Sequence, residues 1–223
     1  MRIRLVTEGS LEHFRAAGTE RECDLLMFGF EGLGEVDYRR ELAGETAKLE
    51  ALARLSREAG CTVLSGCTTI SCGLRSRSIA AADRGRLLGV ADMLHVSGGG
   101  WTGGAHLKVL DTSAGKIGLC VGEDLFYPAV ASTLSLCDAD LICCAFGHAE
   151  DSAPQLMARA CAFWAGVPVC MCAAGIAQAA DARGEVCFRS ARRECAFELT
   201  CEREYRLTTV RSRGLSRPSR ADD

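Results

Sequence analysis

The chain has 223 residues, of which 48% are hydrophobic and 25% are charged, and its formal net charge is −3. This length and composition suit one well-buried globular domain, and the slight negative charge argues against general binding to nucleic acid. No apolar run reaches the ~18 residues of a membrane span and the N-terminus lacks a signal-peptide pattern, so we expect a cytoplasmic protein with no membrane contact.

Strands and helices alternate along the predicted chain. Strands are predicted at 2–6, 24–28, 62–68, 78–82, 86–91, 108–110, 117–121, 140–145, 167–173 and 185–188. Helices are predicted at 41–59 and 153–165, with a weaker one after Pro128. Glycines indicate turns at 73–77 and 182–184. Because some strands are joined by helices and others by short turns, we expect an α/β fold with mixed sheets and helices outside.

The domain organisation is simple. The sequence contains no internal repeat and no linker, so residues 1–210 are predicted to form a single domain. Residues 211–223 are rich in Arg and Ser and have almost no apolar side chains, which predicts a loose tail.

The most informative motif covers residues 115–128, which read Gly-Lys-Ile-Gly-Leu-Cys-Val-Gly-Glu-Asp-Leu-Phe-Tyr-Pro. A short apolar strand ends in a Gly-Glu-Asp turn, and a helical pattern then leads to Ala139-Asp140 and a second strand. This pattern resembles the nitrilase, or carbon–nitrogen hydrolase, superfamily. The resemblance implies a nitrilase-like α-β-β-α sandwich, shortened here by some tens of residues. In the family this motif surrounds a catalytic cysteine, but this chain has Gly122 at that position.

The resemblance also implies a glutamate that acts as a base and a lysine that stabilises the charge developing on the substrate. In the same register Met93 stands at the lysine position and Glu31 at the glutamate position. Glu31 is therefore the expected relic base, whereas Met93 and Gly122 leave two triad positions vacated. If the register is right, the Cα atoms of these three residues should lie within about 10–12 Å of one another. The family's second glutamate is missing from the glycine-rich loop 96–109, which we interpret as a shortened lid.

Four other residues around the motif are candidates for the site. Cys120 lies two residues before Gly122, so we expect it on the same side of the strand, either as a displaced nucleophile or as a core thiol. Glu123 is expected at the pocket mouth, and Asp124 is predicted to cap the turn or the next helix. His95 matches a family histidine and either lines the pocket or is a structural hydrogen-bonding residue.

Fourteen cysteines are unusual for this length. A disulfide framework is not expected in a chain that is neither small nor secreted, and the spacing of the cysteines matches no zinc motif. The pairs Cys143-Cys144 and Cys170-Met171-Cys172 lie inside apolar strands, where cysteine acts as a small hydrophobe. We therefore expect no metal and no cofactor.

Three functional hypotheses remain open. The leading one is a catalytically silent family member that binds a small carbonyl or amide ligand, or acts as a scaffold, with Glu31, Glu123 and Met93 in the pocket wall. The alternative is a hydrolase of carbon–nitrogen bonds that uses Cys120, or a water activated by Glu31. The third is a cysteine-rich redox or metal-binding protein. In each case apolar residues at 126–127 and 163–164 predict a homodimer.

Overall fold

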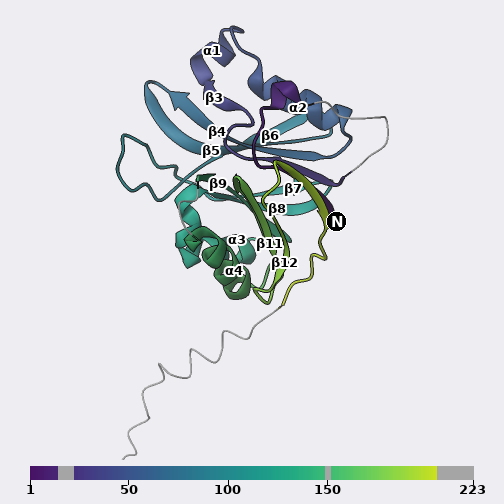
Figure 1. Cartoon of the computed structure of the whole chain (residues 1–223). Helices are drawn as coiled ribbons and strands as arrows, with labels where there is room; N and C mark the ends of the chain where they lie inside the picture. The colour runs from purple at the N-terminus through teal and green to yellow at the C-terminus, as the bar shows by residue number, and fades with distance from the viewer. Residues whose placement is uncertain (15–22, 149–151, 205–223) are drawn as a thin grey trace, which may run out of the picture.

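Two β-sheets face each other and helices cover their outer faces in the computed structural model, which describes residues 1–14, 23–148 and 152–204 (Figure 1). The predicted α-β-β-α sandwich is therefore confirmed. Residues 211–223, the predicted tail, lie outside the described residues. None of the helices in the described ranges is long and apolar enough to cross a membrane.

The first sheet has seven strands. They are β1 (Arg2–Val6), β2 (Leu25–Phe28), β3 (Gly34–Asp37), β4 (Thr62–Ser71), β5 (Leu74–Asp83), β6 (Arg86–Asp92) and β13 (Glu194–Glu198). Their order is β13-β1-β2-β4-β5-β6, and β3 also pairs with β4. The outer side carries a 3-10 helix at Leu11–His13 and the helices α1 (Tyr38–Leu42) and α2 (Lys48–Glu58). Helix α2 buries Leu52 and Leu55 against this sheet.

The second sheet has six strands in the order β12-β11-β10-β9-β8-β7. They are β7 (Lys108–Thr112), β8 (Gly115–Val121), β9 (Leu141–His148), β10 (Val169–Ala174), β11 (Ile176–Ala180) and β12 (Val186–Ser190). Helices α3 (Pro128–Leu136) and α4 (Ala153–Ala165) cover its outer face (Figure 1). Helix α4 has Pro154 in its first turn and ends at Gly166, whose φ of +62° suits a residue without a side chain.

Side chains of the central strands alternate between two apolar layers. In β8, Leu119 and Val121 enter the core between the sheets, whereas Cys120 enters the core beneath α3 and α4. In β5, Ile79 faces the other sheet and Ala80 faces α2. Because successive strand residues point to opposite faces, the position of one side chain fixes the direction of its neighbours.

Several predicted boundaries are wrong. The helix predicted at 41–59 is two helices, because the chain leaves the first at Ala43 and turns at Gly44, where φ is +71°. Leu42, the last residue of the first helix, is 90% exposed as a result. The turn predicted at 73–77 is confined to the start of that range, since β5 begins at Leu74. This places Arg77 inside a strand. Strands β3, β11 and β13 were not predicted at all.

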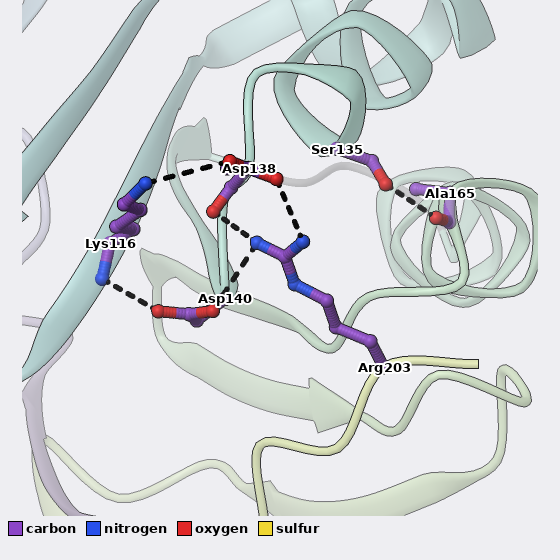
Figure 2. A network of polar contacts seen from close by, with 6 residues as sticks. All are labelled: Lys116, Ser135, Asp138, Asp140, Ala165 and Arg203. Carbon is purple, nitrogen blue, oxygen red and sulfur yellow. Dashed lines mark hydrogen bonds and ion pairs between the residues drawn. The ribbon is translucent and has the colours of Figure 1, made fainter. Parts of the chain in front are cut away.

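An ion-pair network ties the last described segment to one end of the second sheet (Figure 2). Arg203 Nη1 lies 3.2 Å from Asp138 Oδ1, and Arg203 Nη2 lies 3.3 Å from Asp140 Oδ1. Lys116 donates its backbone N–H to Asp140 Oδ2 at 2.9 Å and places its ammonium 3.5 Å from Asp138 Oδ2. The hydrogen bond from Arg203 and the charge of Lys116 lower the pKa of the Asp138 carboxyl. These carboxylates thus hold the segment after β13 against the start of β8.

Candidate functional site

Gly122 and Met93 meet at the end of β8. A 3-10 helix (Gly122–Phe126) starts directly after the strand, and Gly122 has a φ of +53°, which side chains rarely tolerate. A Cβ atom built on Gly122 would lie 2.8 Å from Met93 Sδ, closer than real contacts allow. The structure therefore brings these two predicted triad positions together, with the methionine sulfur filling the space that a side chain at 122 would need.

Arg77 enters this site from the first sheet. Met93 donates its backbone N–H to the Arg77 carbonyl at 2.8 Å, which aligns the two strands. Arg77 lies two residues before Ile79 and so shares the face that points toward the other sheet. Its Nη1 atom lies 4.0 Å from the built Cβ of Gly122 and 3.8 Å from that of Gly147. A guanidinium thus stands beside Gly122, the position at which the resemblance predicts a vacated nucleophile.

Glu123 pairs with this guanidinium. Arg77 Nη1 donates to Glu123 Oε1 at 2.7 Å, and the two side chains are 29% and 32% exposed. The other carboxylate oxygen, Oε2, is buried and has no hydrogen-bond partner among the described residues. The sequence predicted Glu123 at a pocket mouth, and the structure places it half-buried beside Arg77. Arg77 was missed because the sequence interpretation put it in a turn; strand alternation back from Ile79 would have placed it on the inner face.

Trp101 covers the ion pair from the glycine-rich loop. Its ring lies 5.1 Å from the Arg77 guanidinium carbon and 5.4 Å from that of Arg75. The loop is anchored along β5, because Thr102 donates its backbone N–H to the Arg75 carbonyl at 2.7 Å and Ser76 Oγ donates to the Thr102 carbonyl at 2.8 Å. These contacts hold the glycine-rich loop along β5 and bring its indole close to two cations.

Asp124 is a buried carboxylate that holds two segments together. Its Oδ2 atom accepts the Leu94 backbone N–H at 2.9 Å. Its Oδ1 atom lies 2.8 Å from both the backbone N and the ring Nδ1 of His95. The prediction of a helix cap is wrong, since neither the 3-10 helix nor α3 has a side-chain cap. Asp124 instead ties the end of β6 to the turn after β8, and the His95 ring stacks on Tyr127 with 3.7 Å between centroids.

Glu31 is not held in this site. It lies in the turn after β2, is exposed, and makes no hydrogen bond or ion pair with the residues that the structure describes. Phe30, one residue earlier, instead packs against the inter-sheet core that contains Met93. Because neighbouring residues at a strand end point in different directions, a shift of one residue in the register decides which side chain reaches the core.

Cys120 lies on the opposite face of β8 from Met93. Its side chain packs with Leu125 and Val130 beneath the helices. The expectation that it faces the same side as position 122 is wrong, because the left-handed turn at Gly122 ends the strand alternation. A hydrogen bond with Cys144 and complete burial raise the pKa of the Cys120 thiol well above its ordinary value. Both features oppose formation of a thiolate at neutral pH.

Most of the other thiols are also unlike reactive cysteines. None of the fourteen cysteines forms a disulfide, and nine of them are buried. Burial raises the pKa of Cys67 and Cys161 to about 12 in each case. Within the described ranges no group of three or more His, Cys, Asp or Glu side chains could hold a metal ion.

Comparison with known proteins places this geometry in context. The family model described as carbon-nitrogen hydrolase matches residues 12–191. No curated protein matches the sequence. The fold is similar to a C145A mutant of the Nesterenkonia AN1 amidase from the nitrilase superfamily, with 18% identity, 88% of each chain covered and a TM-score of 0.73. It is also similar to a carbon-nitrogen hydrolase from Helicobacter pylori G27 (16% identity, 85% of each chain, TM-score 0.71) and to Saccharomyces cerevisiae Nit3 (15%, 88% of each chain, TM-score 0.73). At these identities the solved structures show a shared fold.

Proposed function

This chain belongs to the carbon–nitrogen hydrolase family, and we propose that it is a member without thiol-dependent amide or nitrile hydrolysis that acts in binding or scaffolding. The observation that carries the proposal is the contact at the end of β8. A glycine occupies the nucleophile position and a methionine sulfur fills the space beside it. Neither residue can attack a carbonyl carbon or stabilise the negative charge that forms on its oxygen.

The comparison with a thiol amidase sharpens this proposal. In the E41L mutant of the Nesterenkonia sp. AN1 amidase, the acetamide moiety of fluoroacetamide is added covalently at the active site cysteine. In this chain the nearest cysteine along the strand, Cys120, is buried on the helix side and has a raised pKa. Removing one member of a catalytic unit usually lowers the rate by several orders of magnitude, and removing a second adds little. Two vacated positions are thus consistent with a silent site.

The competing function is hydrolysis by a displaced nucleophile. The nucleophile could be the Cys120 thiol, or a water molecule that Glu31 activates. The burial of Cys120 and the exposure of Glu31 both weigh against this alternative.

Assays for ammonia release test both functions directly. We expect the purified protein to release no ammonia from simple amides, nitriles or carbamoyl compounds above the rate of a buffer control. Cys120→Ser and Glu31→Gln are the matched variants, since each removes one candidate group with little change in size. Turnover that is lost in either variant would refute the silent-site proposal and identify the group responsible.

Self-association is part of the same proposal. Phe126, Tyr127, Leu156, Phe163 and Trp164 are between 37% and 61% exposed, in or next to α3 and α4 on one side of the sandwich. A patch of this kind favours a homodimer. Light scattering at tens of micromolar should report twice the mass of one chain, and a Leu156→Lys variant should report the mass of a single chain. A monomer in both samples would contradict the proposal.

Fourteen thiols without a disulfide further favour a reducing compartment such as the cytoplasm.

A further inference from the structure

Arg77 and Glu123 place two opposite charges where the family's catalytic thiol and lysine are missing. We propose that this pair is a receptor for a small zwitterion of the α-amino acid class, with the ligand carboxylate on Arg77 and the ligand ammonium on Glu123. This inference rests on the proposed loss of thiol chemistry, because the two charged groups then bind a ligand without cleaving it.

The guanidinium supplies the anion-binding half of the site. A guanidinium has five N–H donors, and one of those on Arg77 donates to a described acceptor, Glu123 Oε1. The Arg77 side chain is 29% exposed beside the Trp101 indole, so its remaining donors can reach a ligand once the indole moves aside. A guanidinium binds a carboxylate through two parallel hydrogen bonds, which an ammonium cannot do. Arg77 therefore suits a carboxylate better than a neutral carbonyl.

Glu123 supplies the half that binds a donor. Its Oε2 atom is buried without a partner, and an unsatisfied buried carboxylate oxygen is unfavourable. A ligand N–H that reaches Oε2 removes the free-energy cost of this unpaired oxygen. Without a ligand the protein retains that cost. Because a ligand shifts a site toward the state that it binds better, the unpaired oxygen favours ligands with an N–H donor.

Trp101 supplies an apolar wall, and Met93 closes the site on its core side. The indole lies over Arg77 at 5.1 Å, and the Met93 sulfur fills the space next to Gly122. Trp101 is partly exposed and presents apolar surface beside the guanidinium, whereas Met93 is 2% exposed and belongs to the core behind Gly122. Entry requires displacement of the indole from Arg77, since Trp101 covers the guanidinium. An amino acid with an aliphatic side chain matches one apolar wall and two charges.

Calorimetric titration of the intact protein with the twenty common amino acids tests this inference. We expect at least one of them to bind with a dissociation constant below a millimolar. For the tightest binder, the analogues that lack the amine or the carboxylate are then titrated; for leucine these are 4-methylpentanoate and isoamylamine. Each analogue should bind at least tenfold more weakly, because it leaves one charge of the pair without its partner.

Two site variants and one surface control complete the test. Arg77→Lys should weaken binding of the amino acid at least tenfold. Glu123→Gln should remove the preference for the amino acid over its analogue without the amine, which for leucine is 4-methylpentanoate. Arg40→Lys alters a surface ion pair with Glu45 of 3.3 Å and should leave binding unchanged. Circular dichroism spectra and melting curves establish that each variant is folded.

The inference is overturned if no amino acid binds at concentrations up to ten times the highest expected dissociation constant. It is also overturned if binding persists unchanged in both site variants, which would assign the ion pair a purely structural role. The proposed function fails by a different result, the release of ammonia in the hydrolysis assay. A protein that neither binds amino acids nor releases ammonia would therefore refute this receptor while leaving the silent-site proposal in place.

Discussion

Asp124→Ala should lower the free energy of unfolding by roughly 3–5 kcal/mol, the range for breaking a buried charged network. The carboxylate is 1% exposed and accepts the Leu94 and His95 backbone N–H groups and contacts the His95 ring. Alanine leaves these donors without an acceptor in a place that water reaches poorly. The segment after β6 then loses its connection to the turn after β8, and with it the position of Met93. Urea denaturation monitored by tryptophan fluorescence measures the loss.

Two further variants make this first prediction specific. Asp124→Asn keeps one acceptor oxygen at the same place and should cost less than the alanine variant, since part of the network survives. Asp111→Ala removes an exposed carboxylate from β7 and should change stability by no more than about 0.5 kcal/mol, as is usual for surface substitutions. Equal unfolding midpoints for wild type and Asp124→Ala would show that the network contributes no stability.

The double variant Gly122→Cys with Met93→Lys should contain a thiol that alkylates at least about tenfold faster at pH 7 than any native cysteine, because nearby cations lower a thiol pKa. The Arg77 guanidinium lies 4.0 Å from the Cβ position at 122, and the new lysine adds a second charge. Replacement of Met93 also removes the sulfur that would lie 2.8 Å from the new Cβ. Site-resolved mass spectrometry after brief treatment with iodoacetamide measures the rate.

Controls separate the reasons for this second effect. At a φ of +53°, any side chain at 122 is expected to lower stability by about 1–3 kcal/mol, and Gly122→Ala measures that cost alone. Exposed Cys72 and Cys137 are the internal references for the alkylation rate. Adding Arg77→Met should slow the new thiol. A rate equal to that of Cys72 would show that no positive field surrounds position 122. We expect no recovery of hydrolysis, because Glu31 is exposed and the lid carries no second glutamate.

The sequence predicted the architecture better than the site. The alternation of strands and helices predicted an α/β fold with helices outside, since it depends on local patterns, and the resemblance carried by the motif at 115–128 implied the two-sheet sandwich. The meeting of Met93 with Gly122 was also expected from the resemblance, because in the family register these residues stand at two positions of one catalytic triad. These parts depend on register along single segments, which a sequence displays directly.

The parts of the site that were predicted wrongly depend on the direction in which side chains point, and this direction changes where a strand ends. Cys120 was expected beside position 122, but the left-handed turn at Gly122 places them on different sides. Asp124 was expected to cap the turn or the next helix because short acidic residues often serve there, whereas its side-chain partners come from a segment about thirty residues earlier. Arg77 was assigned to a turn, so its entry into the site was missed. Contacts between distant segments leave no pattern in a single sequence.

The pairing of β1 with β13 has a consequence for how the protein folds. Arg4 contacts Glu194 across 190 positions of the chain, and Ile3 pairs with Phe197. Closing so long a loop carries a large entropic penalty, and contacts between distant positions slow folding. During synthesis β1 leaves the ribosome long before β13. The edge of β1 that pairs with β13 therefore stays unpaired until nearly the whole described chain has been made. Completion of the first sheet is therefore a late event, and the period before it is when this protein is most exposed to aggregation.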